Sequence, residues 1–188
     1  MLFRSDEFSQ FDTVISYLIS AIFTPQYSAL MALFRLFTGP KVLIVVMLLV
    51  LSWIMLYGRN RLLEVRFLFI TILGGAFLGQ ALKLIFHRVG PDGYILTFPS
   101  QQALLAVVVY GFASYMVLRH ARKRRYGILL LCLTPAVCLA RGLSVIFFHM
   151  QYPSDVLAGY VFGGVWLSLN IVMLEVFRVL PRIQEEQE

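Results

Sequence analysis

The sequence predicts an all-α integral membrane protein: a helical bundle of five or six transmembrane helices with an amphipathic N-terminal segment. Composition is the first observation behind this prediction. Of the 188 residues, 60% are hydrophobic and only 14% are charged, and the mean hydropathy is +0.81. In soluble domains charged residues approach roughly a quarter of the chain. The second observation is that the apolar residues fall into runs of about twenty, the length that an α-helix needs to cross a bilayer.

Five apolar stretches meet or approach the length of a membrane span and carry no interior charge cluster. They are residues 41–57, 66–86, 102–119, 126–148 and 156–177. The connections between them are short, which leaves room for one bundle and no second folded domain. We therefore expect a membrane segment over 1–40, a transmembrane bundle over 41–177 and a cytoplasmic polar tail over 178–188.

The N-terminal segment 12–37 is ambiguous, because Pro25 interrupts its apolar run and a proline inside a helix breaks the hydrogen-bond ladder. Two interpretations stay open. Residues 12–24 and 26–37 form two amphipathic helices on the outer membrane surface, or the stretch crosses as a kinked sixth span. Its polar residues favour the interfacial pair: Ser16, Ser20, Thr24, Ser28 and Arg35. No removable signal peptide is expected, so the mature chain is expected to begin at or near Met1.

Basic residues set the expected orientation, because the cytoplasmic loops of membrane proteins are enriched in Lys and Arg. Such clusters follow the first span, over residues 59–66, and the third span, over residues 119–125. Placing both clusters in the cytoplasm brings segments 87–101 and 149–155 together on the external side of the cell membrane. The same clusters account for the net charge of +6, so nucleic acid is not expected as a partner.

Three strings of residues lie at this external side. Residues 86–92 read Phe-His-Arg-Val-Gly-Pro-Asp, residues 97–102 read Thr-Phe-Pro-Ser-Gln-Gln, and residues 152–160 read Tyr-Pro-Ser-Asp-Val-Leu-Ala-Gly-Tyr. In this order, separated by apolar spans, they resemble the motifs of the bacterial type 2 phosphatidic acid phosphatase family. The resemblance covers residues 41–177. It implies the fold of enzymes that remove phosphate from phosphatidic acid, phosphatidylglycerophosphate and undecaprenyl diphosphate.

The family's first motif is a lysine, six residues, then Arg-Pro, and both cations hold the substrate phosphate by charge-assisted hydrogen bonds. Lys83 is present here, but Gly90 stands at the arginine position before Pro91. Arg88 lies two residues earlier, where many members also have an arginine. The resemblance therefore implies a partial phosphate clamp. The alternative is that Lys83 and Arg88 only snorkel at a helix end.

The family's second motif is Pro-Ser-Gly-His, in which the histidine is the general acid for the leaving alcohol. Ser100 is retained in this chain, whereas Gln101 and Gln102 replace the glycine and the histidine. A glutamine donates hydrogen bonds but has no proton to transfer near neutral pH.

The third motif is Ser-Arg, five residues, His, three residues, Asp, in which the histidine attacks phosphorus and the aspartate fixes its tautomer. Counting back from Asp155 puts Gln151 at the nucleophile, Val145 at the arginine and Ser144 at the serine. A carboxamide cannot form a phospho-enzyme.

The resemblance thus implies a catalytically inactive lipid-phosphatase-like protein, with no catalytic residue and a degenerate site that binds an anionic lipid phosphate. We expect eight residues in that site: Lys83, Arg88, Ser100, Gln101, Gln102, Ser144, Gln151 and Asp155. No cofactor or metal is expected, because the sequence has no ligand cluster at metal spacing. The predicted partners are membrane lipids and a membrane protein for which this chain is an accessory subunit.

Two alternative functions stay open. One is an active lipid phosphatase with an atypical site, in which His149 acts in a shifted register and Arg141 replaces the lost arginine. Loss of a nucleophile costs other enzymes on the order of a million-fold in rate, and His149 is more simply a histidine at the membrane interface. The other alternative is a purely structural membrane subunit.

Overall fold

The computed structural model describes residues 8–37, 39–58, 60–91, 93, 96–121 and 124–185. These residues form seven α-helices and one short 3-10 helix, with no β-strand, which confirms the predicted all-α class. The elements in chain order are α1 (Ser9–Ile22), η1 (Pro25–Tyr27), α2 (Ser28–Phe37), α3 (Pro40–Tyr57), α4 (Arg61–Phe86), α5 (Gln101–His120), α6 (Arg124–Phe147) and α7 (Pro153–Glu185).

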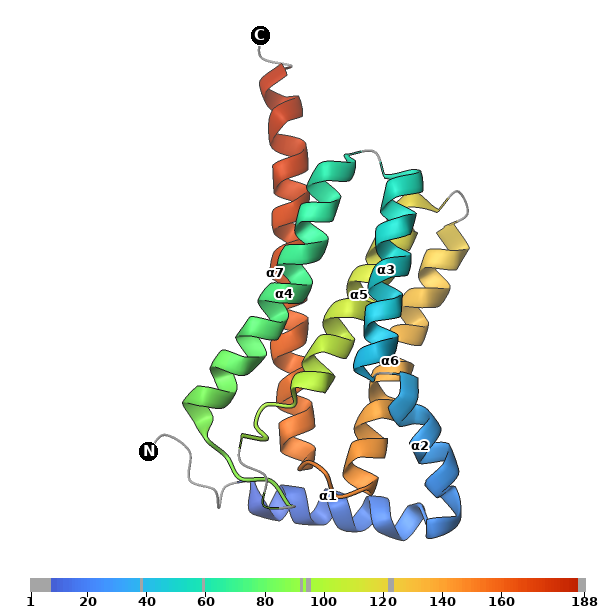
Figure 1. Cartoon of the computed structure of the whole chain (residues 1–188), viewed down its shortest axis with the longest axis vertical. Helices are drawn as coiled ribbons and strands as arrows, with labels where there is room; N and C mark the ends of the chain where they lie inside the picture. The colour runs from blue at the N-terminus through green and yellow to red at the C-terminus, as the bar shows by residue number, and fades with distance from the viewer. Residues whose placement is uncertain are drawn as a thin grey trace.

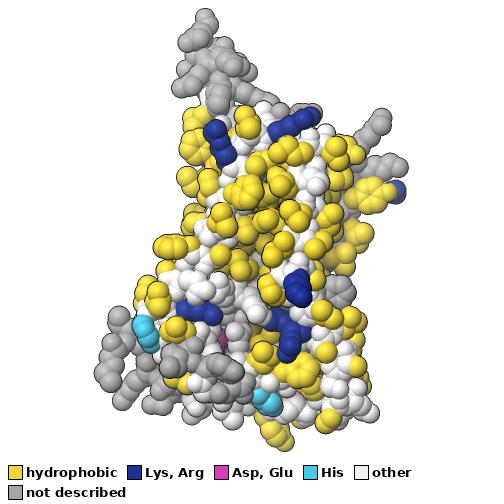
Figure 2. Space-filling model, viewed as in Figure 1, with side chains coloured by type: hydrophobic (Ala, Val, Ile, Leu, Met, Phe, Trp, Pro, Cys, Tyr) yellow, Lys and Arg dark blue, Asp and Glu magenta, His cyan; other side chains and the backbone are white. Residues whose placement is uncertain are grey.

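Five helical stretches of the described chain are long and apolar enough to cross a membrane, as predicted. They are Pro25–Tyr57, Arg61–Phe86, Gln101–His120, Arg125–Phe147 and Pro153–Leu180. The first is longer than the predicted span because it also includes η1 and α2. Large apolar side chains stay exposed along the outside of the bundle, among them Leu49, Leu56 and Phe77 (Figure 2). Such a broad apolar surface is typical of a face in contact with lipid.

Helix α1 lies across one end of the bundle, transverse to the long helices (Figure 1). The α4–α5 and α6–α7 connections lie at the same end, which we call the α1 end. Pro25 begins the 3-10 helix that separates α1 from α2, so the chain breaks at the proline as predicted. Ile19 of α1 packs with Ala103, Ile146 and Val156, one residue each from α5, α6 and α7. This contact docks α1 onto the bundle.

Helices α5 and α7 cross at very short range, and this crossing places the start of α7 beside the start of α5. A Cβ atom at Gly159 would lie 2.5 Å from the Ser100 carbonyl oxygen, and one at Gly163 would lie 2.8 Å from that of Leu104. Small residues let helix backbones approach in this way. As a result, the Ser100 backbone N–H donates to the Asp155 carbonyl at 2.9 Å, which joins two of the loops singled out in the sequence.

A buried ionic network joins α4, α5 and α7 at the opposite end of the bundle. The Glu64 carboxylate is completely buried and lies 3.1 Å from His120 Nε2 and 3.9 Å from Arg178 Nη2. Arg178 also pairs with Glu175 at 3.6 Å. Charges removed from water are tolerated only when they are paired. The network therefore holds together the end of the bundle that is far from α1.

Glu64→Gln is expected to destabilise the bundle, because it leaves the buried Arg178 guanidinium without its Glu64 partner. Removing one member of a buried ion pair costs about 3–5 kcal/mol. We expect a clearly lower midpoint of thermal unfolding in detergent micelles. The matched control is Arg66→Gln, at an exposed position of the same helix. Equal midpoints for the two variants would contradict the role given to Glu64.

Candidate functional site

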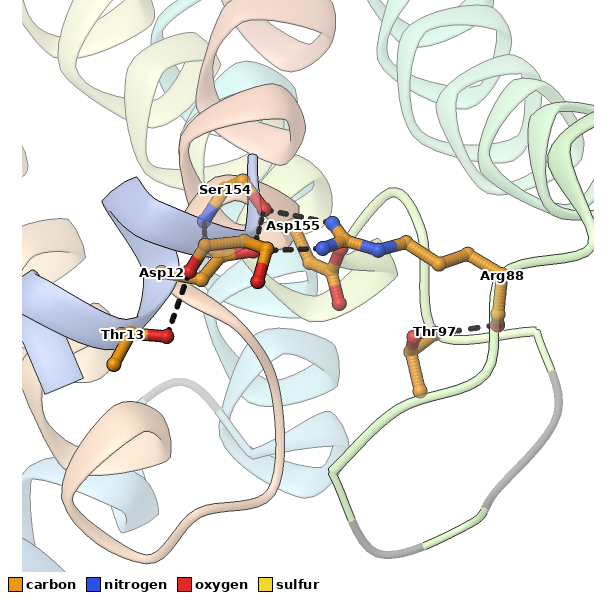
Figure 3. A network of polar contacts seen from close by, with 7 residues as sticks. Asp12, Thr13, Arg88, Thr97, Ser154 and Asp155 are labelled. Carbon is orange, nitrogen blue, oxygen red and sulfur yellow. Dashed lines mark hydrogen bonds and ion pairs between the residues drawn. The ribbon is translucent and has the colours of Figure 1, made fainter. Parts of the chain in front are cut away.

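Arg88 lies at the centre of a polar cluster at the α1 end (Figure 3). It follows His87, which ends α4 in the left-handed conformation with φ of 45° and turns the chain out of the helix. Arg88 Nη1 donates to Asp155 Oδ1 and to Ser154 Oγ, each at 2.7 Å. Its Nη2 donates to Asp12 Oδ2, also at 2.7 Å. One guanidinium therefore bridges the α4–α5 loop, the first turn of α7 and α1.

Asp12 is almost completely buried although it lies on the amphipathic helix α1. Its Oδ1 accepts the Ser154 backbone N–H at 2.8 Å, and its Oδ2 accepts the Ser154 hydroxyl at 2.7 Å. Ser154 is the second residue of α7, and free N–H groups in the first turn of a helix attract anions. Asp12 thus supplies a carboxylate to a position suited to an anion: a helix N-terminus beside an arginine.

Asp155 is completely buried, and the described residues that contact its carboxylate include only one cation at ion-pair distance, Arg88. The Arg88 guanidinium also lies over the Tyr152 ring, 4.7 Å from the ring centroid. We call Asp12, Arg88, Tyr152, Ser154 and Asp155 the Arg88 cluster. A cavity of about 510 Å³ opens beside it, lined by residues that include Asp12, Arg88 and Tyr152.

Four of the eight residues predicted for the site converge here. Arg88 and Asp155 are ion-paired, and Ser100 is joined to Asp155 through the backbone. The Ser100 hydroxyl is already used, since it accepts from the Ala103 N–H at 3.3 Å as the N-cap of α5. Lys83 is half-buried and interacts electrostatically with Asp155. Its ammonium makes no hydrogen bond or ion pair with the residues that the structure describes.

The other four predicted residues lie in different surroundings. Gln101 packs against Gly79 of α4, and Gln151 has a buried Oε1 that accepts no hydrogen bond from the described part of the chain. The Ser144 hydroxyl donates to the Met31 carbonyl at 2.6 Å and so holds α2 against α6. Gln102 is exposed and lines a cavity other than the one beside Arg88. The eight residues are therefore distributed over more than one site.

The residues of the alternative active site form no hydrogen bond or ion pair with the side chains of the Arg88 cluster in the described chain. His149 is exposed, has φ of 52° and follows the end of α6. Neither it nor His87 or His120 hydrogen-bonds Asp155. Arg141 is 4% exposed, and its Nη1 donates to the Arg35 carbonyl at 3.2 Å. It lines the same cavity as Gln102, which shares no lining residue with the cavity beside Arg88.

The described residues include no group of three or more His, Cys, Asp or Glu side chains arranged to hold a metal ion.

Sequence reasoning missed Asp12, Ser154 and Tyr152 as members of the cluster. Asp12 is the only acidic residue in the helix Ser9–Ile22, and this was the one signal that pointed to it. A lone acid in an amphipathic helix does not reveal a partner 76 positions away. Ser154 and Tyr152 stood within the string that carries the family resemblance, but the motif assigns a role only to the aspartate.

Residues 88–178 match the family model described as the PAP2 superfamily. This stretch, just under half of the chain, is similar to that superfamily. The matched stretch begins at Arg88, includes Ser100 and Asp155, and ends at Arg178. It therefore contains much of the site together with α5, α6 and most of α7.

Two solved structures share the fold. The transmembrane PAP2-type phosphatidylglycerolphosphate phosphatase from Bacillus subtilis superposes with a TM-score of 0.79 at 19% identity, over 92% of this chain and 88% of that one. Aquifex aeolicus LpxE superposes with a TM-score of 0.63 at 18% identity, over 85% of this chain and 93% of that one. No curated protein sequence matches the chain. At these identities the likeness concerns the transmembrane PAP2 fold.

Asp12→Ala is expected to loosen the docking of α1 on the bundle, because it removes the α1 carboxylate from Arg88 and Ser154. Hydrogen bonds to charged groups contribute about 1.5–3 kcal/mol each. The reporter is Ile19→Cys at a buried position of α1, in a protein that lacks Cys132 and Cys138. We expect this thiol to react with a maleimide at least roughly tenfold faster when Asp12→Ala is present than when Asp12 is retained. Ser20→Ala, at an exposed position of α1, is the control. Unchanged labelling in Asp12→Ala would show that α1 docks without this carboxylate.

Proposed function

We propose that this chain is a catalytically inactive, lipid-phosphatase-like membrane protein that binds an anionic lipid phosphate without hydrolysing it. The arrangement of Asp155 is the observation that carries the proposal. In the mechanism implied by the motifs, a buried aspartate orients the histidine that attacks phosphorus. Here the Asp155 carboxylate is bound by Arg88, and no described histidine hydrogen-bonds it. An aspartate neutralised by arginine has no nucleophile to orient.

The glutamines support the same proposal. Gln151 occupies the position that the resemblance assigns to the nucleophile, and Gln102 occupies that of the general acid. Neither carboxamide can attack phosphorus productively or transfer a proton near neutral pH. Activity through His149 and Arg141 requires an exposed histidine and a buried arginine to move together into the site of Asp155. We therefore favour the inactive protein over the active phosphatase.

Lipid binding in this proposal begins with the cations of the degenerate site. Lys83 is half-buried without an ion-pair partner in the described chain, and an anion beside it would be favoured by charge. Arg88 is already paired with Asp12 and Asp155, so a lipid phosphate competes with these two carboxylates for the guanidinium. Placement of this site on the external side of the cell membrane, and a membrane-protein partner, stay predictions of the same proposal.

The purified protein is expected to release no phosphate from phosphatidic acid, phosphatidylglycerophosphate or undecaprenyl diphosphate in mixed micelles. The reason is that no described histidine hydrogen-bonds Asp155. The measurement is colorimetric phosphate release, compared with that of His149→Ala. Equal background rates are the expected result. Release by the parent protein that disappears in His149→Ala would establish the active alternative instead.

A further inference from the structure

A second cavity lies between α2, α3, α5 and α6, away from the Arg88 cluster. Its volume is about 700 Å³, and its lining includes the basic residues Arg35, Lys41 and Arg141 together with Gln102. Ligand cavities in proteins commonly measure roughly 300–1,000 Å³. Basic side chains also gather over the lower part of the face shown in Figure 2, where α2 meets α3. No Asp or Glu is among the described residues that line this cavity.

The three cations of this cavity lack counter-ions among the residues that the structure describes. None of them forms an ion pair with a carboxylate of the described chain, in contrast to Arg88. Arg141 is 4% exposed and its buried Nε has no hydrogen-bond partner there. Arg35 reaches only the Met150 sulfur, at 3.4 Å, and the Phe148 ring, 5.8 Å from its centroid. A buried guanidinium beside two further cations is costly unless an anion neutralises it.

An apolar groove continues from the cavity into the bundle. The two share Pro40 and Gln102, and the groove is lined otherwise by Leu43, Ile44, Met47, Ile72, Leu105 and Val109. Seven residues of helix separate Pro40 from Met47 and Gln102 from Val109, so the groove runs about 10 Å along both helices at 1.5 Å per residue. Its volume is about 190 Å³.

The geometry points to a binding site for a phosphate-bearing anionic membrane lipid, with the phosphate at Arg35, Lys41 and Arg141 and one acyl chain in the groove between α3 and α5. A cationic cavity that opens into an apolar groove matches a molecule with an anionic head and an apolar tail. Arginine donors suit phosphate oxygens, and Gln102 adds a neutral donor at the junction. This inference rests on the proposed lipid binding and adds to it a phosphate site outside the motif cations Lys83 and Arg88.

The test measures binding of three probes to the purified full-length protein in detergent micelles: dioctanoyl phosphatidic acid, dioctanoyl phosphatidylcholine and inorganic phosphate. We expect phosphatidic acid to bind at least roughly tenfold more tightly than either of the others, because only it combines a head of net negative charge with apolar chains. Comparable binding of inorganic phosphate and phosphatidic acid would overturn the groove as the place of the acyl chain. Comparable binding of the two lipids would overturn the cationic cavity as the place of the head.

Charge-removing variants locate the phosphate. Arg141→Gln is expected to weaken phosphatidic acid binding roughly tenfold or more, since charge-assisted hydrogen bonds to phosphate are stronger than neutral ones. Because Arg141 is buried, Lys41→Gln provides a second variant at an exposed position, with an expected loss of roughly two- to fivefold. Arg66→Gln, at an exposed position of α4 outside both sites, is the matched control and is expected to leave binding unchanged. Lys83→Gln measures the part of the binding that depends on the motif site.

A loss in Lys83→Gln with no loss in Lys41→Gln or Arg141→Gln would overturn this inference and leave the proposed function standing. Phosphate release from the probe would instead overturn the proposed function. Ile44→Trp tests the groove, because an indole at this position fills the space beside α5. We expect it to weaken binding of phosphatidic acid and to leave that of inorganic phosphate unchanged. Unchanged binding of both probes would place the acyl chain elsewhere.

Discussion

The α1 end of this protein depends on the ion pairs that Arg88 makes with Asp12 and Asp155. Both carboxylates are buried, and a buried carboxylate is stable only beside a cation or strong donors. Arg88 serves the two at once, and Ser154 donates twice more to Asp12. Three parts of the chain meet at this point: the transverse helix α1, the loop after α4 and the first turn of α7. Without the guanidinium, two negative charges would face each other in a buried site.

The two basic regions of this end differ in how their charge is neutralised. The Arg88 cluster carries its own anions, because Asp12 and Asp155 come from the same chain. The cavity at Arg35, Lys41 and Arg141 has no carboxylate among its described lining residues. Arg88 lies among the motif residues, but its two carboxylate partners make it less available to a ligand anion than the cations of this cavity. Cations without a carboxylate partner in the described chain, beside an apolar groove, attract a ligand that brings its own negative charge, which is why we place a lipid phosphate there.

The fold of this protein depends on fewer specific side chains than phosphate hydrolysis does. The PAP2 fold is kept at 19% identity to the Bacillus subtilis enzyme, because close helix crossings and apolar outer faces tolerate many sequences. The crossing of α5 over α7 needs small residues at positions such as Gly159, and these hold the motif loops side by side whatever chemistry they carry. Hydrolysis requires a few specific side chains in one place, so function has to be argued from the site.

The sequence alone determined the class of protein, the five spans and the break at Pro25, because each depends on a local property: the apolar length of a helix or the missing N–H of a proline. It also indicated the convergence of Arg88, Ser100 and Asp155, through strings whose order carries a family resemblance. Only the tertiary structure decided that Asp12 pairs with Arg88, that Ser144 is used to hold α2, and that Arg35, Lys41 and Arg141 line one cavity. These residues are isolated charges or hydroxyls in their own segments, and no periodicity marks them. Their partners are chosen by how the helices pack, which brings together positions up to 142 residues apart.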